Sequence, residues 1–241
     1  QTLERLARRG DLAPGAFGRF EAHELDAVMT GLFDECARLF AEWPQALDEV
    51  QVTFETAVDG RVLRLSDTLG GLRAGPDGDR LRVVVEASAV ERGKDRFRER
   101  RDHVVLRHWP AHLAAQLGGP TATRLVSPDG GAVLPPLEAD VARGYLADWL
   151  AAWDEGMRAP LPLAVRTAFA WLKAKPERRE EEARKAYEGD DRRPGERDRD
   201  AHLARAWPDF DALRAGGFAD CVQRLLEPMR AALDGLKGDG E

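Results

Sequence analysis

Two neighbouring β-rich segments carry acidic residues in an order that metal-dependent nucleases use. In such enzymes an Asp at the end of one strand and an Asp/Glu-x-Lys sequence on the next bring two carboxylates and a lysine to one sheet edge. The carboxylates hold Mg²⁺ there, and the lysine orients or activates the attacking water. The alternation of apolar and polar residues predicts such strands over residues 61–73 and 80–88. The sequence therefore has the layout of a nuclease site.

The residues at the decisive positions do not complete that site. Glu86 is present, but Ser88 stands where the lysine is expected. Gly70 and Gly71 occupy the place of the Asp, and Asp67 lies three or four residues too early, a displacement of roughly 10 Å along a strand. We therefore expect no catalytic residue and no metal here, with Glu86 a solvent-facing strand residue. An active Mg²⁺ site built from Asp67 and Glu86 is the alternative.

The other side chains that could take part in catalysis or metal binding do not form a recognisable catalytic or metal-binding motif. His108 and His112 have the i, i+4 spacing of helical zinc ligands, but Pro110 lies between them and no Glu or Cys completes the set. Neither a phosphate-binding glycine loop with a following lysine nor a G-x-S-x-G sequence is present. We expect no cofactor. Cys36 and Cys221 are too few for a disulfide scaffold, which favours a reduced, cytoplasmic protein.

The hydrophobic pattern predicts the elements that position these residues. A helical stripe of apolar residues runs over 23–43 and ends at Pro44. Asp59-Gly60 is a hairpin signal, and it lies within a predicted three-stranded antiparallel meander made of residues 51–57, 61–73 and 80–87. A charged, then amphipathic, helical region is expected over 95–116.

The second half of the chain is mostly helical by the same criteria. A short strand over 121–126 and a turn at 128–131 precede the long helix that Pro135 and Pro136 open. We predict an α/β fold with a small mixed sheet flanked by helices and a C-terminal helical bundle. The expected division is an α/β domain with N-terminal helices over 1–160 and a helical part with a charged loop at 177–200 over 161–241.

The net charge of −7 excludes a protein that binds nucleic acid through a uniformly basic surface. One stretch differs: residues 91–107 hold seven basic and four acidic side chains. The candidate DNA-facing residues are therefore Arg92, Lys94, Arg96, Arg98, Arg100, Arg101 and Arg107. A solvated helix of mixed charge is the alternative for this stretch.

Aromatic residues are the candidates for a protein–protein interface, since Trp anchors many such surfaces. Those of the C-terminal part are Trp171, Trp207 and Phe210, together with Trp153 in the preceding helix. The alternative is that they form the core of the helical bundle. No run of 18 apolar residues could span a membrane.

Several blocks resemble the C-terminal domain of the gamma chain (RecC) of exodeoxyribonuclease V. The shorter ones are 65–72 (LSDTLGGL), 107–113 (RHWPAHL) and 123–125 (TRL). The more specific signal is an ordered series of four blocks: 161–172 (LPLAVRTAFAWL), 183–189 (ARKAYEG), 195–200 (GERDRD) and 203–211 (LARAWPDFD). Because the chain also lacks an initiator Met, we expect it to be a piece of a subunit several times longer.

The resemblance implies a nuclease-like domain of the PD-(D/E)xK type that has lost its catalytic residues, with a small helical bundle attached. Such a domain is not an enzyme by itself. The resemblance implies a place in a helicase–nuclease complex that acts in double-strand break repair by homologous recombination. The implied partners are DNA and the beta and alpha helicase chains (RecB and RecD). The implied roles are support of duplex splitting and assembly of the alpha chain.

Overall fold

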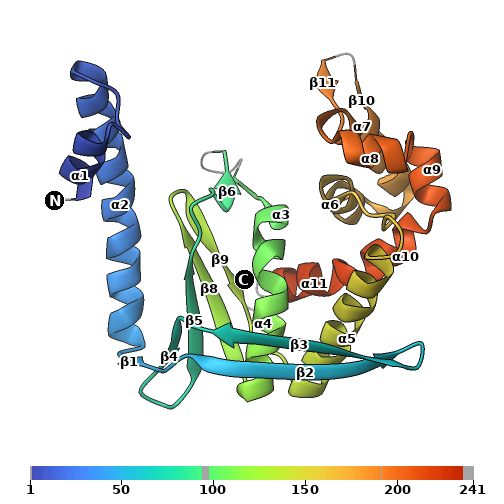
Figure 1. Cartoon of the computed structure of the whole chain (residues 1–241), viewed down its shortest axis with the longest axis horizontal. Coiled ribbons are helices and arrows are strands. Elements are labelled where there is room, and N and C mark those ends of the chain that lie inside the picture. The colour runs from blue at the N-terminus through green and yellow to red at the C-terminus, as the bar shows by residue number, and fades with distance from the viewer. Residues whose placement is uncertain (1, 94–97, 191, 236–241) are drawn as a thin grey trace.

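A mixed five-stranded sheet lies at the centre of the computed structural model, which describes residues 2–93, 98–190 and 192–235 (Figure 1). Its strand order is β1-β4-β5-β8-β9, with bounds Gln45–Ala46, Leu72–Ala74, Arg80–Val85, Thr121–Ser127 and Gly130–Leu134. Only β5 and β8 run parallel. Their crossover is α3 (Asp102–Val105), a 3₁₀ turn and α4 (Trp109–Ala115). The predicted α/β class is confirmed.

The predicted meander divides into two sheets. β2 (Val50–Val58) and β3 (Arg61–Leu69) form a long hairpin of their own, closed by Asp59 and Gly60 at positive φ, as predicted. Gly70 and Gly71 end β3, and the chain re-enters the central sheet as β4. Arg61 donates to the buried Asp154 of α5 at 2.5 Å and so fixes the tip of the hairpin.

The N-terminal helices form an arm that extends past the sheet (Figure 1). They are α1 (Thr2–Arg9) and α2 (Ala16–Glu42), and the second confirms the predicted helical stripe. Only its C-terminal part packs on the sheet, where Leu32 and Leu39 meet residues of β5 and β8. Other apolar side chains along the same helix stay exposed, in its packed part as well as before it: Phe17, Phe20, Leu25, Val28, Met29, Phe33 and Phe40.

The C-terminal half is a bundle of short helices beside the long α5 (Ala139–Gly156). Their bounds are α6 Val165–Lys173, α7 Arg179–Glu188, α8 Ala201–Ala206, α9 Phe210–Ala215, α10 Phe218–Leu225 and α11 Glu227–Gly235. Asp200 and Asp209 cap α8 and α9 through their side chains, and Pro228 marks the break before α11. The segment 177–200 differs from the predicted loop, because α7 buries Ala183 and Tyr187 completely.

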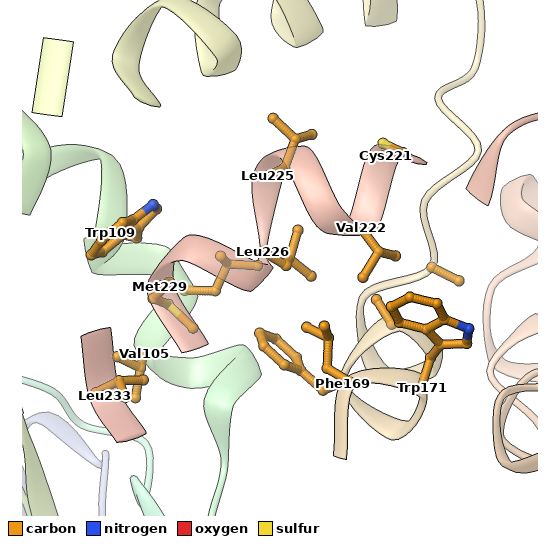
Figure 2. Packing of buried hydrophobic residues seen from close by; sticks show 14 of the residues in the cluster. Val105, Trp109, Phe169, Trp171, Cys221, Val222, Leu225, Leu226, Met229 and Leu233 are labelled. Atoms are coloured by element: carbon orange, nitrogen blue, oxygen red, sulfur yellow. The ribbon is translucent and has the colours of Figure 1, made fainter. Parts of the chain in front are cut away.

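The main hydrophobic core joins the sheet to this bundle. It contains buried side chains from Phe54 in β2 to Leu233 in α11 and so crosses the predicted boundary at residue 160. Figure 2 shows side chains of α10 and α11 lying between Trp109 of α4 and Phe169 of α6. Both parts therefore share one core, and the division into 1–160 and 161–241 stays a prediction.

The charged stretch before α3 is a hairpin where a helix was expected. β6 (Glu91–Arg92) pairs antiparallel with β7 (Glu99–Arg100). Within the helical prediction over 95–116, the described residues 98–101 are not helical, and the prediction is right from Asp102 onward. Alternating charges without an apolar stripe do not distinguish a solvated helix from a hairpin, which explains the error. Lys94 and Arg96 lie outside the described residues.

Candidate functional site

The carboxylate at the end of β5 is enclosed by protein partners. Glu86 is only 9% exposed, which corrects the prediction of a solvent-facing residue. Its Oε2 lies 2.9 Å from Nε2 of His108, which the 3₁₀ turn after α3 carries across from the sheet. Its Oε1 accepts the backbone N–H of Ser88 at 2.7 Å. Both carboxylate oxygens are thus engaged within the chain.

Electrostatics favour the ionised form of this carboxylate. Burial by itself raises the pKa of Glu86, but the hydrogen bonds from Ser88 and His108 outweigh it and hold the pKa below 4.5. The group is therefore an anion at neutral pH whose two oxygens accept hydrogen bonds within the chain. Such a carboxylate has little capacity left to bind a cation.

Of the two glycines at the expected Asp position, Gly71 cannot carry a side chain without a backbone shift. Gly71 has φ +76°, and a Cβ on it would lie 2.6 Å from the carbonyl oxygen of Val83. The N–H of Val83 donates to the Gly71 carbonyl at 2.9 Å, which keeps the two strands at this separation. The close approach of the backbones therefore closes the Gly71 position. A Cβ on Gly70 would meet only the side chain of Glu49, whose Oε1 would lie 3.1 Å away.

The other acidic candidate lies in a different sheet. Asp67 is exposed on β3, opposite Val52 of the β2–β3 hairpin, and its Oδ1 accepts the N–H of Thr68 at 2.7 Å. Residues 2–93, 98–190 and 192–235 contain no group of three or more His, Cys, Asp or Glu side chains placed to hold a metal ion. Asp67 and Glu86 therefore stand on separate sheets with separate partners.

The two histidines at helical spacing also have separate partners. His108 contacts Glu86, whereas the fully buried His112 has its Nδ1 2.9 Å from Oγ1 of Thr123 in β8. Burial, and then the charge of Arg82, lower the pKa of His112 to about 4. His112 is therefore a neutral core residue at physiological pH.

Five of the seven cations singled out between 91 and 107 lie among the described residues, and these five have different surroundings. Arg100 is largely buried and pairs with Asp102 at 2.6 Å and with Asp234 at 3.1 Å, so it holds the fold. Arg98 pairs with Glu91 at 3.0 Å, and Arg101 donates to a backbone carbonyl. The exposed side chains are those of Arg92, Arg98 and Arg107.

A second source of positive charge lies next to this segment and has no signal in the local sequence. Burial, and then the charges of Arg101, Arg166, Arg107 and Lys173, lower the pKa of His103 to about 4. Arg166 and Lys173 come from α6, more than 60 residues away in the chain. The fold therefore concentrates cations from α6 beside the β6–β7 hairpin.

The aromatic residues predicted at a partner interface belong to the core. Phe210 is 1% exposed and Trp171 is 7% exposed, so neither can anchor a partner on the surface. Trp207 is half-buried and donates its indole N–H to the carbonyl of Leu161 at 3.0 Å. Periodicity showed that these residues share helix faces, but it could not show which faces are covered. The large exposed aromatics lie instead on the arm and at Trp153.

Comparisons with known proteins agree with the resemblance found in the sequence. A family model described as the RecC C-terminal domain matches residues 1–176. The RecBCD enzyme subunit RecC of Mycolicibacterium smegmatis is 32% identical over 176 residues, which is 70% of this chain and 14% of the relative. Of the four C-terminal blocks, only 161–172 falls within the match to the family model. The chain thus spans about one seventh of the length of this relative.

Proposed function

This chain belongs to the family of RecC C-terminal domains, and from that premise we propose that it is a non-catalytic structural and DNA-handling domain. It would act as part of the gamma subunit in the RecBCD helicase–nuclease (exodeoxyribonuclease V), in double-strand break repair by homologous recombination. Its partners in this proposal are DNA and the beta and alpha helicase chains, in the cytoplasm. The described residues contain no helix with the length and hydropathy to cross a bilayer.

The observation that carries the non-catalytic part is the closed end of β5. The position expected for an Asp is a glycine whose Cβ would collide with Val83, and Ser88 replaces the lysine. The remaining carboxylate, Glu86, is bound by His108 and by the Ser88 backbone. A hydrolytic Mg²⁺ site needs several free oxygen ligands, whereas the end of β5 offers one carboxylate whose two oxygens already have partners.

A cleavage assay tests this proposal. The chain is incubated with end-labelled single- and double-stranded DNA in Mg²⁺ and, separately, in Mn²⁺. We expect all DNA to be recovered at full length. Cleavage that disappears in both Glu86→Ala and Asp67→Ala would establish the alternative, an active nuclease using these two carboxylates. Cleavage that persists in both variants would identify a contaminant and leave the proposal standing.

The exposed apolar side chains of α2 support the assembly role. Phe17, Phe20 and Phe33 are 74%, 61% and 63% exposed, although the helix has a packed C-terminal part. Uncovered aromatics in this density are typical of a protein–protein contact. Burial of such side chains against a partner supplies roughly 2 kcal/mol each. The arm is therefore the described surface that contact with the alpha helicase chain would use.

Co-purification tests the assembly role in the full gamma chain. Substitution of Phe20 and Phe33 by Asp is expected to abolish stoichiometric recovery of the alpha chain. A matched variant that introduces two Asp residues at exposed polar positions of the same helix, His23 and Thr30, is expected to retain it. Equal recovery of the alpha chain with both variants would contradict a contact through the arm.

A further inference from the structure

A groove of about 1020 Å³ lies between two β-hairpins that are nearly 100 residues apart in the chain. One wall is the β6–β7 hairpin, which contributes Arg92 and Glu99. The other wall is the hairpin of β10 (Gly189–Asp190) and β11 (Arg193–Pro194), and α6 and α7 form the floor. Both hairpins point the same way from the body of the molecule (Figure 1).

Ion pairs, one of them with a buried carboxylate, fix the first wall. Asp102 is 1% exposed and accepts Nε of Arg100 at 2.6 Å, and Arg100 also reaches Asp234 of α11. Lys173 of α6 donates to Glu99 at 2.9 Å. These contacts tie the β6–β7 hairpin to the floor of the groove and to the last helix, so the wall is held in position before any ligand binds.

Carboxylates of the loop next to β11 fix the second wall. Glu196 accepts the backbone N–H groups of Arg166 and Thr167 at 3.0 and 2.7 Å, which caps the start of α6. Asp190 accepts the N–H groups of Arg192 and Arg193 at 2.8 and 2.9 Å and so closes the hairpin turn. The second hairpin is therefore attached directly to the floor.

The groove is lined by more cations than carboxylates, and most of these cations form no ion pair with a carboxylate among the described residues. Its acidic residues each have a partner: Glu99 with Lys173, Glu182 with Arg178, and Asp190 and Glu196 with the backbone. Its cations outnumber them, six against four: Arg92, Arg166, Lys185, Arg192, Arg193 and Arg199. Among the described residues, only Lys185 of these six forms an ion pair with a carboxylate.

The local potential is correspondingly positive in a chain whose net charge is −7. A smaller cavity of about 290 Å³ continues from the groove along Arg92 and Arg166 and contains His103. The pKa of His103 falls to about 4 because of burial and because four cations surround it. The cations that surround this imidazole favour an anion beside it.

We propose that this groove binds the sugar–phosphate backbone of a single DNA strand through Arg92, Arg166, Arg193 and Arg199. Guanidinium groups match phosphate oxygens in geometry and charge. Walls on both sides admit one strand more readily than a duplex, and no exposed aromatic side chain among the described residues lines the groove for base stacking. Binding is therefore independent of base sequence and depends steeply on salt.

This inference rests on the proposed DNA-handling function. It adds that the ligand is a single strand, that arginines bind its phosphates, and that the groove is the binding site. It uses β10–β11 and α7, which lie beyond residues 1–176 that the family model covers. The groove therefore combines a surface of the family domain with a segment outside that match.

Fluorescence anisotropy with a labelled oligo-dT tests the groove. The test variant is Arg166→Ala with Arg193→Ala, since both side chains are exposed and only their backbone groups support the fold. The control is Arg64→Ala with Arg143→Ala, which removes the same charge from exposed positions on β3 and α5. We expect the groove variant to bind about tenfold more weakly, with a salt slope reduced by about 1.4, and the control to bind like the unaltered chain.

Each outcome decides the question. Equal loss of affinity in the two variants would overturn the groove and leave DNA handling in place. Binding of a duplex of equal length more tightly than oligo-dT would overturn the assignment to a single strand. Failure of the unaltered chain to bind any DNA at low salt would overturn both the groove and the DNA-handling part of the proposed function. Circular dichroism melting confirms that every variant is folded.

Discussion

The end of β5 and the groove between the hairpins use charged side chains in opposite ways. At the end of β5 the carboxylate of Glu86 is bonded to His108 and Ser88, and the neighbouring position is closed by backbone. In the groove the acidic groups are bonded within the chain, whereas the exposed guanidiniums of Arg166 and Arg193 face solvent without a carboxylate among the described residues. Charge satisfied within the fold stabilises it, and charge left unsatisfied is available to a ligand.

The largest effect should come from forcing a side chain into the closed position. Gly71→Asp places a Cβ 2.6 Å from the Val83 carbonyl at φ +76°, so we expect a loss of about 4 kcal/mol of unfolding free energy. Gly78 has φ +82° with open space around it, and Gly78→Asp should cost only about 1 kcal/mol. Urea midpoints measure both. Equal losses, or DNA cleavage gained by Gly71→Asp, would show that the position is open.

The next effect concerns the anchor of the first groove wall. Asp102→Asn removes the charge of the buried one of the two carboxylates that pair with Arg100, and we expect a loss of about 2 kcal/mol together with weaker DNA binding. Asp211→Asn breaks an exposed pair with Arg184 at 2.6 Å and should lower the unfolding free energy far less, because solvent screens this pair. Thermal unfolding and anisotropy report the two effects. If DNA affinity is unchanged in folded Asp102→Asn, the groove does not depend on this wall.

A smaller effect is expected at the paired carboxylate. His108→Ala leaves Oε2 of the buried Glu86 without its partner, so we expect a loss of about 1.5 kcal/mol. The folded-state pKa of Glu86 is lowered, so its stabilisation is present above the unfolded pKa and is lost as pH falls through the folded pKa. The unfolding free energy of His108→Ala should therefore fall less between pH 5 and pH 3 than that of the unaltered chain. An equal fall in both proteins would contradict the pairing of Glu86 with His108.

The smallest effect is the pH dependence of stability that His103, in the cavity beside the groove, contributes. His103, with a pKa of about 4, stays neutral when folded, whereas the unfolded imidazole takes up a proton near pH 6.5. Stability is therefore complete above pH 6.5 and decreases as pH falls toward 4. Because His103 is half-buried, solvent screening reduces the loss between pH 6.5 and 5.5 to about 0.5 kcal/mol, roughly half of what the unscreened shift would give. His103→Asn should flatten this decline, and the exposed control His23→Asn should not.

The local parts of the fold could be predicted from the sequence. The helix over 23–43, the Asp59-Gly60 hairpin and the strand at 121–126 each have a periodicity or turn signal within a few residues. The break at Gly70 and Gly71 was missed because glycine in a strand pattern does not reveal whether the chain bends or continues. The absence of Asp and Lys at the nuclease positions could be seen, but the partners of Glu86 could not.

The features that depend on burial or on contacts between distant segments could not be predicted from the sequence. Trp171 and Phe210 fit both an interface and a core by helical spacing, and only packing places them inside. The basic stretch 91–107 was visible, but Arg166 and Arg193 join it only through the positions of α6 and β11. A window of sequence contains no information on which distant cations the fold brings together.

One measurement tests the central claim most directly: the fate of labelled single-stranded DNA incubated with the chain in Mg²⁺ as salt is raised. The account predicts salt-dependent binding that Arg166→Ala with Arg193→Ala weakens about tenfold, and DNA recovered at full length at every salt concentration. DNA that is cut, with cutting abolished by Glu86→Ala, would contradict the account, because the end of β5 would then be a working site.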